Sequence, residues 1–264
     1  MRRLEDYLLK TNLEIRDRYK DIIYPIAVFV AIIIIWQAIV VCMDIPGYLL
    51  PAPSDIVSVF FTDTENLMKH AWITTYEAVT GFFIAVVISI LIGIVMDFIP
   101  IVRKSLYPLM LTTQMIPTIT IAPLLVIWFG FGMLPKVLMV TLTCFFPILI
   151  SFVDGLENID KDYLNLFKTM KAGKIDTFRH LKFPMSMEKF FSGLKISATY
   201  AVMAATVAEW LGGTEGLGVY MLRSKKAYAL DKVFASTILI VILSLIFVGI
   251  VHLVRKSVLK KYNK

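Results

Sequence analysis

Two carboxylates stand inside long apolar stretches of the sequence and are its first candidates for chemistry. Glu77 lies in TTYEAVTGFF and Glu209 lies in VAEWLGG. A carboxylate in the middle of a bilayer costs about 2.5 to 3.5 kcal/mol, so each side chain must face a partner or water. We expect Glu77 to be paired or solvated near an interface. We expect Glu209 to position the loop that follows it, with direct contact to a ligand as the alternative.

A second polar group surrounds Pro117. It consists of Gln114, Met115, Thr118 and Thr120. Backbone unwound by proline, together with small hydroxyls, makes a polar site at membrane depth without exposing polar groups to lipid. The competing arrangement is that the hydroxyls bond their own helix. Such a site, which lacks cations, suits a neutral or weakly anionic small solute.

Catalytic chemistry finds little support in the sequence. His252 could serve a serine nucleophile, which would make the chain an intramembrane protease. That enzyme needs an activated serine with oxyanion donors, yet no GxSxG motif surrounds Ser89, Ser151 or Ser244. A channel is the other alternative, although no ring of charges and no filter such as TVGYG is present. We therefore expect no catalytic residue in this chain.

Cofactor and metal motifs are also missing. No GxxxxGK[ST] loop occurs, so ATP hydrolysis would have to take place on another chain. Cys42 and Cys144 lie in apolar runs without a CxxC or CxxxC neighbour. We expect both to be buried structural thiols, with no disulfide and no zinc site.

The composition is that of a membrane protein. Of the 264 residues, 58% are hydrophobic and only 18% are charged, and the mean hydropathy is +0.76. The net charge of +7 does not indicate nucleic acid, because bilayer proteins concentrate Lys and Arg in cytoplasmic loops. Residues 1–21 are densely charged, so we expect no removable signal peptide and a first span that anchors the protein.

Apolar runs of about 20 residues predict membrane helices. Five are plain: Ile22–Met43, Ile73–Met96, Leu134–Val153, Phe190–Leu211 and Val233–Val254. A sixth run, about Ser105–Phe129, contains Pro108, Pro117 and Pro123 and predicts a broken span that faces protein or a pathway. The expected fold class is all-α, a polytopic membrane protein with six transmembrane helices.

Six spans place both termini on one side, and the basic residues indicate which side. Lys and Arg gather in 1–21, at Arg103 and Lys104, in the loop 154–189 and in the tail 255–264. Those parts are therefore expected in the cytoplasm. The expected order is a cytoplasmic segment 1–21, a first helix 22–43, an external segment 44–72, a five-helix core 73–254 that includes the loop 154–189, and a cytoplasmic tail.

The loop 154–189, here called the polar loop, has its own periodicity. Leu164, Phe167 and Met170 recur at helical spacing, Ala172 and Gly173 interrupt, and the pattern resumes with Ile175, Phe178 and Leu181. Two short amphipathic helices are expected, the second ending before Pro184. Such helices either lie on lipid or insert apolar side chains into a groove of another protein.

Several stretches resemble one family. YLLPAPSDIVSVF (48–60), IPTITIAPLLVIWFGFG (116–132), FFPILISFVDGLENID (145–160) and VAEWLGGTEGLGVYM (207–221) follow one another in the order found in permease subunits of binding-protein-dependent ABC importers. The chain looks most similar to the nitrate, sulfonate, taurine and pyrimidine-precursor type, with the type I importer fold. On this loop the family has a motif written EAA, three residues, G, nine residues, I, one residue, LP. The chain matches this motif in spacing more than in residue types. It falls on Asn165, Leu166, Phe167, Lys171, Leu181, Phe183 and Pro184.

The resemblance implies function and partners. It implies a cell-membrane importer subunit that pairs with a second copy, contacts two cytosolic ATPase subunits that hold ATP and Mg²⁺, and receives solute from an external binding protein. The polar loop would then contact the ATPase, with Leu164, Phe167, Phe178 and Leu181 seated in its cleft. The wider set of contact candidates is Asn165, Lys168, Lys171, Ala172, Gly173 and Pro184. Gln114, Met115, Thr118, Thr120 and Glu209 are candidates for the pathway. Lys171 stands where the family keeps glycine, so either Gly173 takes over the turn or the loop has its own geometry.

Overall fold

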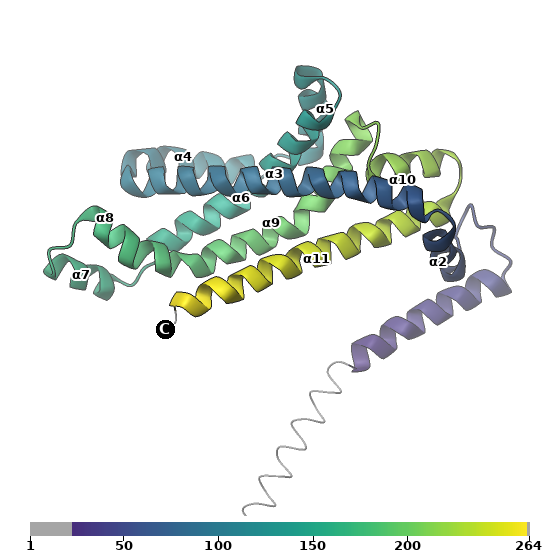
Figure 1. Cartoon of the computed structure of the whole chain (residues 1–264), viewed down its shortest axis with the longest axis horizontal. Coiled ribbons are helices and arrows are strands. Elements are labelled where there is room, and N and C mark those ends of the chain that lie inside the picture. The colour runs from purple at the N-terminus through teal and green to yellow at the C-terminus, as the bar shows by residue number, and fades with distance from the viewer. Residues whose placement is uncertain (1–22, 263–264) are drawn as a thin grey trace, which may run out of the picture.

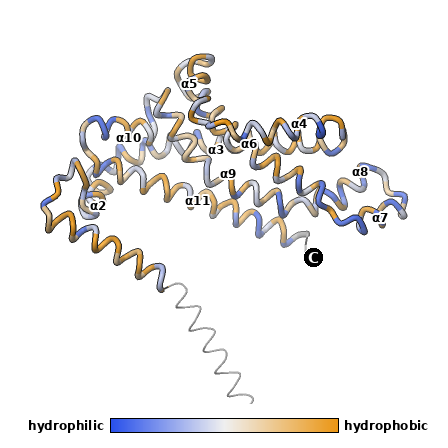
Figure 2. The backbone as a smooth tube through the Cα atoms, turned by 180° about the vertical axis from the view of Figure 1, so that it is seen from behind, coloured by the Kyte–Doolittle hydropathy of each residue, from blue (hydrophilic) through white to orange (hydrophobic). Residues whose placement is uncertain are grey.

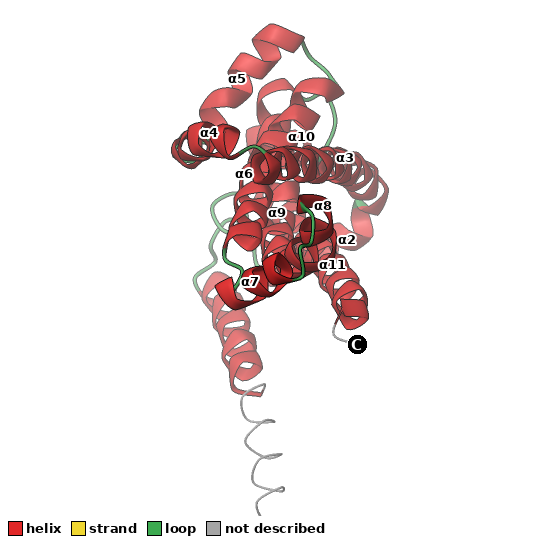
Figure 3. Cartoon of the chain, turned by 90° about the vertical axis from the view of Figure 1, so that its left-hand side faces the viewer, coloured by secondary structure: helices red, strands yellow, loops and turns green. Residues whose placement is uncertain are grey.

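The computed structural model describes residues 23–262, and within them every regular element is a helix (Figure 3). The predicted amino-terminal segment and its cations lie outside the described residues. The chain runs through a first helix, Ile23–Cys42, and then α2 Pro53–Thr62, α3 Thr64–Phe98, α4 Pro100–Thr113, α5 Thr118–Phe129, α6 Met133–Glu157, α7 Lys161–Thr169, α8 Lys174–Thr177, a π-helical turn Phe178–Lys182, α9 Phe183–Gly212, α10 Leu217–Lys226 and α11 Leu230–Tyr262. The all-α prediction is confirmed.

Five helical stretches are long and apolar enough to cross a membrane. They are Ile23–Cys42, Thr64–Phe98, Met133–Glu157, Lys174–Gly212 and Leu230–Lys260. The pair α4 and α5 passes the same test together but bends by 101° at its break. The pair is compatible with the expected broken sixth span, and its break, residues 114–117, contains the proline that cannot continue the first helix.

The core is formed where α6 and α9 pack against each other and against α3. Phe152, Ile148 and Leu149 of α6 are among its most buried side chains. Small residues permit the close approach: a Cβ on Gly81 would come within 2.6 Å of the Cβ of Val140. In a membrane no hydrophobic effect drives helices together, so close approach of their backbones, with the van der Waals contact it gives, stabilises the packing.

The helices run lengthwise between two polar ends. Figure 1 shows α7, α8 and the carboxyl end of α11 at one end of the bundle, and α2 and α10 at the other. Hydrophilic residues gather at these ends in Figure 2, while the spans between them are mostly hydrophobic. The first helix stands away from the bundle, and only 6% of its apolar window is buried within the chain.

The polar loop differs from the prediction at its second helix. Pro184 does not end that helix, because Lys174–Gly212 is one continuous helix of 39 residues, and Pro184 is the second residue of α9. The π-helical turn explains the difference. The amide of Phe183 donates to the Phe178 carbonyl five residues earlier, and this wider turn accommodates a proline that lacks an N–H and would clash with the carbonyl four residues back.

The helices also extend beyond the predicted spans. α3 begins at Thr64, inside the segment 44–72 that was expected to be external, and α2 lies wholly within that segment. α11 continues to Tyr262, past Val254. Hydropathy marks only the length of chain that suits lipid, whereas a helix continues into water wherever its polar side chains and end contacts allow it.

Candidate functional site

Helix α7 is the first half of the polar loop, and local interactions close both of its ends. Asp160 accepts a hydrogen bond from the Asp162 amide at 3.0 Å, which caps the amino terminus. At the carboxyl end the Lys171 amide donates to Lys168 at 2.9 Å, and the Ala172 amide donates to Phe167 at 3.0 Å. This pair of bonds is the Schellman arrangement, whose turn residue adopts the left-handed conformation.

Lys171 is that turn residue. Its φ is 55°, whereas Gly173 has a φ of −67° and an extended backbone before α8. Gly173 therefore does not take over the turn. The position where the resembled family keeps glycine does require a left-handed residue, and here a lysine occupies it.

The side chains of the polar loop divide into an outward and an inward set. Leu166 and Met170 are exposed by 53% and 68%, and Tyr163 and Ile175 are also exposed. Asn165, Lys168, Lys171 and Gly173 are exposed too, whereas Leu164, Phe167, Ala172 and Pro184 are half-buried. The apolar side chains available to a partner are thus mainly those at positions 163, 166, 170 and 175.

Phe178 and Leu181 do not fit the expectation that they seat in a partner. Leu181 is only 5% exposed. The Phe178 ring lies 5.2 Å from Phe98 and 5.9 Å from Phe183, centroid to centroid. Both belong to the chain's own packing, because the second predicted helix is the first part of a span and its apolar face covers the ends of neighbouring spans.

Polar contacts attach this second half of the loop to the bundle. The Lys182 ammonium lies 2.6 Å from a carboxylate oxygen of Asp97, in the last turn of α3. Nearby, the Tyr107 hydroxyl donates to Asp154 at 2.6 Å, and Arg103 lies 2.6 Å from Glu157. These contacts join the π-helical turn to α3, and α4 to the carboxyl end of α6.

The broken span borders a cavity of about 360 Å³. Gln114 and Thr118 line it, together with Thr143 and Tyr200 from α6 and α9 and a mostly apolar remainder. Met115 is 80% exposed and does not line it. Thr120 does not line it either, and its hydroxyl donates to the Pro117 carbonyl at 2.7 Å. The structure thus brings Gln114 and Thr118 to one cavity, and Thr120 follows the alternative in which a hydroxyl bonds its own helix.

Glu209 lies away from that cavity, at the end of the bundle that carries α10. It is 1% exposed, and both its carboxylate oxygens are occupied: Oε1 accepts from the Thr74 hydroxyl at 2.6 Å and Oε2 from the Gly218 amide at 2.5 Å. Glu209 does not line the cavity beside the broken span. Its two hydrogen bonds support the expectation that it positions the following loop.

The loop before α10 is held by three side chains acting on consecutive amides. His70 Nδ1 accepts from Gly216 at 3.0 Å and the Thr74 hydroxyl accepts from Leu217 at 2.8 Å, while Glu209 accepts from the next amide. These amides have no partner within α10, so side chains of α3 and α9 satisfy them. Sequence reasoning missed His70 and Thr74. A signal for them was the clustering of His70, Thr74 and Glu77 in the amino-terminal part of α3.

Glu77 is paired with Lys136, the cation that follows WFGFG. Both side chains are buried, at 2% and 5% exposure, and they form a salt bridge between α3 and α6. The expectation that Glu77 is paired is confirmed. The side chain is buried, however, and not solvated near an interface. Two oppositely charged residues in apolar surroundings are tolerated there because each neutralises the other.

The cysteines differ from each other. Cys144 is buried and its thiol lies 3.5 Å from the Ser197 carbonyl. Cys42 is exposed on the single chain, so its predicted burial is wrong for the described subunit. Among residues 23–262, no group of three or more His, Cys, Asp or Glu side chains is arranged to hold a metal ion.

The comparison with known proteins agrees with these features. Residues 85–260 match the family described as binding-protein-dependent transport system inner membrane component. A probable ABC transporter permease protein of Haemophilus influenzae is 31% identical over 84% of this chain and 90% of that protein. The formylaminopyrimidine transport permease protein ThiX of Halalkalibacterium halodurans is 34% identical over 84% of this chain and 89% of that protein.

A solved structure has the same fold. It is the methionine ABC transporter MetNI in inward-facing conformations, with a TM-score of 0.63 and 17% identity, covering 76% of this chain and 98% of that one. The protease and channel alternatives find no counterpart in these matches. This chain belongs to the family of inner membrane components of binding-protein-dependent transport systems.

Proposed function

We propose that this chain forms the translocation pathway of an ATP-driven importer for a small solute delivered by an external binding protein. A second copy of the chain and two cytosolic ATPase subunits complete the assembly, and the ATPase subunits hold ATP and Mg²⁺. The observation that carries this proposal is the division of the polar loop into an exposed part and an anchored part. α7 presents exposed Leu166 and Met170 to a partner, while the rest of the loop is anchored to the spans.

The orientation follows from charge. The end with α7 and the carboxyl terminus carries the lysines and arginines of the polar loop and the tail. Positive residues favour the cytoplasmic side, so α7 faces the ATPase compartment and α10 faces the binding protein. Both termini are then cytoplasmic.

The contact with the ATPase is a mechanical one in this proposal. Closure of the two ATPase subunits moves α7, and the Lys182–Asp97 pair and the Phe178–Phe98 contact pass that movement to α9 and α3. Packed helices respond to such a push as rigid bodies that switch between arrangements. Access to the pathway thereby changes from one side to the other.

The cavity beside the broken span indicates the solute class. Its polar groups are the Gln114 amide and the hydroxyls of Thr113, Thr118, Thr143 and Tyr200, and no cation lines it. A neutral heterocycle, of the pyrimidine-precursor kind transported by the ThiX relative, suits such a lining better than a strong anion. A sulfonate-like or nitrate-like anion is the second candidate from the sequence resemblance.

The ATPase contact is tested by co-purification. The chain is co-expressed with its cognate ATPase, and Leu166→Asp combined with Met170→Asp is expected to abolish recovery of the ATPase at unchanged membrane level of the chain. Tyr228→Asp is the control, since Tyr228 is also an exposed apolar side chain but lies directly after α10, at the other end of the bundle. Recovery of the ATPase with the double variant would contradict the proposed contact.

The pathway is tested by solute uptake in proteoliposomes with the binding protein. Thr118→Val removes a hydroxyl from the cavity and is expected to lower uptake about tenfold, the effect of about 1.4 kcal/mol. Thr120→Val makes the same chemical change outside the cavity and is expected to leave uptake unchanged. Equal uptake by the two variants would remove Thr118 from the pathway.

A further inference from the structure

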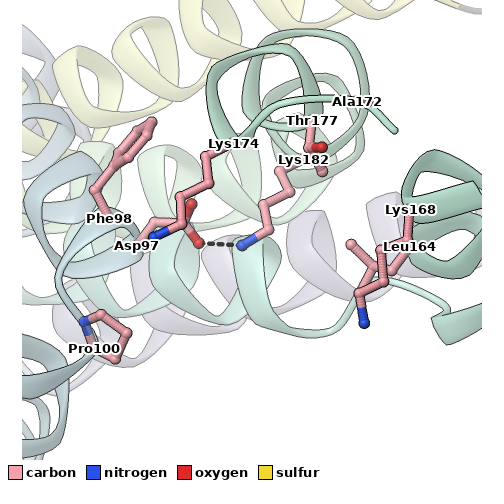
Figure 4. Close-up of a pocket in the computed structure, with 9 residues that line it drawn as sticks. All are labelled: Asp97, Phe98, Pro100, Leu164, Lys168, Ala172, Lys174, Thr177 and Lys182. Carbon is pink, nitrogen blue, oxygen red and sulfur yellow. Dashed lines mark hydrogen bonds and ion pairs between the residues drawn. The ribbon is translucent and has the colours of Figure 1, made fainter. Parts of the chain in front are cut away.

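A cationic cavity of about 400 Å³ lies between α7 and the ends of two spans. Lys168, Lys174 and Lys182 line it with a single carboxylate, Asp97, and the remaining lining is Phe98, Pro100, Leu164, Ala172 and Thr177. Figure 4 shows Lys174 and Lys182 extending toward Asp97, with Leu164 and Lys168 farther off, beyond Lys182.

The charges in this cavity do not balance. Lys182 is paired with Asp97 at 2.6 Å. Lys168 and Lys174 form no ion pair with any of the residues that the structure describes. Two ammonium groups thus share a recess with no carboxylate left to neutralise them, which favours an anion with several acceptor oxygens.

The cavity lies where the candidate span α3 ends and α4 begins. Phe98 ends α3 and Pro100 begins α4, and the adjacent Ile99 and Ile101 are both exposed apolar side chains. Exposed apolar side chains at the end of a span suit contact with lipid. An opening beside such side chains is suited to headgroup depth, and here Phe98 and Leu164 form apolar walls beside the lysines.

The partner surface of α7 lies on the other side of that helix. Leu164 and Lys168 are one turn apart and share the face that lines the cavity, whereas Leu166 and Met170 lie about 200° around the helix. A protein that covers Leu166 and Met170 leaves the cavity open toward the membrane. This placement favours a lipid over an acidic side chain of the ATPase.

From these observations we infer that the cavity binds the phosphate headgroup of an anionic phospholipid in the leaflet at the α7 end. Lys168 and Lys174 hold the phosphate, and Phe98 and Leu164 contact the glycerol and the first methylenes. The bound lipid fixes α7 against α3 and α4. Basic pockets at this depth recognise anionic headgroups in the same physical way.

The test measures lipid retained by the full chain in its complex with the ATPase. Native mass spectrometry counts phosphatidylglycerol bound to complexes taken from nanodiscs of dioleoylphosphatidylglycerol and dioleoylphosphatidylcholine. Each basic residue near an anionic surface contributes about 1 kcal/mol, or about fivefold in affinity, so Lys168→Gln with Lys174→Gln is expected to weaken retention about 25-fold. Lys161→Gln, on α7 but outside the cavity, is the control and is expected to retain the lipid.

Three results would overturn the inference. The first is equal retention of phosphatidylglycerol by the double variant and the control. The second is equal retention of phosphatidylcholine and phosphatidylglycerol by the unaltered chain. The third is displacement of the lipid by inorganic phosphate, which would assign the cavity to a soluble anion. If the double variant loses the ATPase but retains phosphatidylglycerol as the control does, the first result applies, and the two lysines are assigned to the contact with the ATPase.

Discussion

Lys182 and Asp97, 85 positions apart in the sequence, are joined by a hydrogen-bonded ion pair of 2.6 Å. The pair links the π-helical turn of the polar loop to the last turn of α3. Asp97 is nearly buried, with 8% of its side chain exposed. The polar loop is therefore part of the bundle's packing at this point and not a tether that hangs from it.

Breaking this pair should weaken both stability and coupling. Asp97→Asn keeps the shape of the side chain but removes its charge, and Lys182→Gln removes the other partner. A double-mutant cycle in thermal unfolding is expected to give a coupling energy of about 1 to 3 kcal/mol, because the hydrogen bond is charge-assisted and mostly shielded. ATP hydrolysis in the assembled complex should persist while uptake per ATP falls.

An exposed ion pair provides the control. Arg255 and Glu188 lie 3.3 Å apart, and the Glu188 side chain is 75% exposed. The same cycle with Arg255→Gln and Glu188→Gln is expected to give a coupling energy near zero. A coupling energy for Lys182 and Asp97 no larger than this one would show that the pair does not anchor the loop.

The left-handed turn after α7 predicts a stabilising substitution. Lys171→Gly relieves the contact between Cβ and the backbone that a left-handed residue suffers, and should stabilise α7 by about 1 kcal/mol. Hydrogen exchange of the α7 amides measures this as slower exchange by about fivefold.

The neighbouring glycine is the control for this turn. Gly173 has a φ of −67°, and a Cβ there would meet only the Asp176 carboxylate at 3.4 Å. Gly173→Ala is therefore expected to change α7 exchange little. The reverse outcome, with Gly173→Ala destabilising and Lys171→Gly neutral, would place the turn at Gly173.

Gly216 is expected to be intolerant of any side chain. Its φ is 118°, and a Cβ at this position would lie 2.2 Å from the Glu209 carboxylate. Gly216→Ala should lower stability by about 3 kcal/mol, from backbone strain and displacement of Glu209 from the α10 amides. Thermal unfolding in detergent measures the change.

Gly249 gives the matched substitution in open space. It lies in α11, and no atom lies within 4 Å of a Cβ added there. Gly249→Ala should be neutral or stabilise the helix by about 0.5 to 1 kcal/mol. Similar losses at both glycines would mean that the Glu209 contact does not hold the loop before α10.

Acid should weaken the end of the bundle that carries α10. Asp63 accepts hydrogen bonds from Lys232 at 2.7 Å and from Tyr220 at 2.9 Å. Burial acts to raise the pKa of Asp63, but these bonds and one from Asn66 outweigh it and hold the pKa below its ordinary value of 3.8. A lowered carboxylate pKa contributes stability above the unfolded value, and that stability is lost as the pH falls through the folded value.

Asp63→Asn removes this contribution and provides the test. The melting temperature of the unaltered chain should fall more steeply than that of Asp63→Asn between about pH 5 and pH 2. The variant should already be less stable at neutral pH. Parallel acid profiles for the two chains would show that the carboxylate does not stabilise this end.

Local chemistry was sufficient to predict the spans and the start of the polar loop. Apolar runs specify membrane helices because an unpaired backbone is intolerable in lipid, and Pro117 breaks its span because it lacks an N–H. The spacing of Leu164, Phe167 and Met170 likewise predicted α7. The family resemblance rested on the same kind of local signal, short motifs in a fixed order.

What each apolar or charged side chain faces could not be predicted without the packing of the helices. Periodicity shows that Phe178 and Leu181 share an apolar face, but it does not say whether that face meets a partner or the chain's own spans, and here they pack inward. The Glu209 carboxylate accepts a hydrogen bond from Thr74, 135 positions away, and this contact in space could not be read from the sequence. Which segments form membrane helices depends on neighbours along the chain, so residue types and spacing were enough to predict them. The partners of Glu209, Asp97 and Lys182 depend on neighbours in space, and the packing of the helices brings those together.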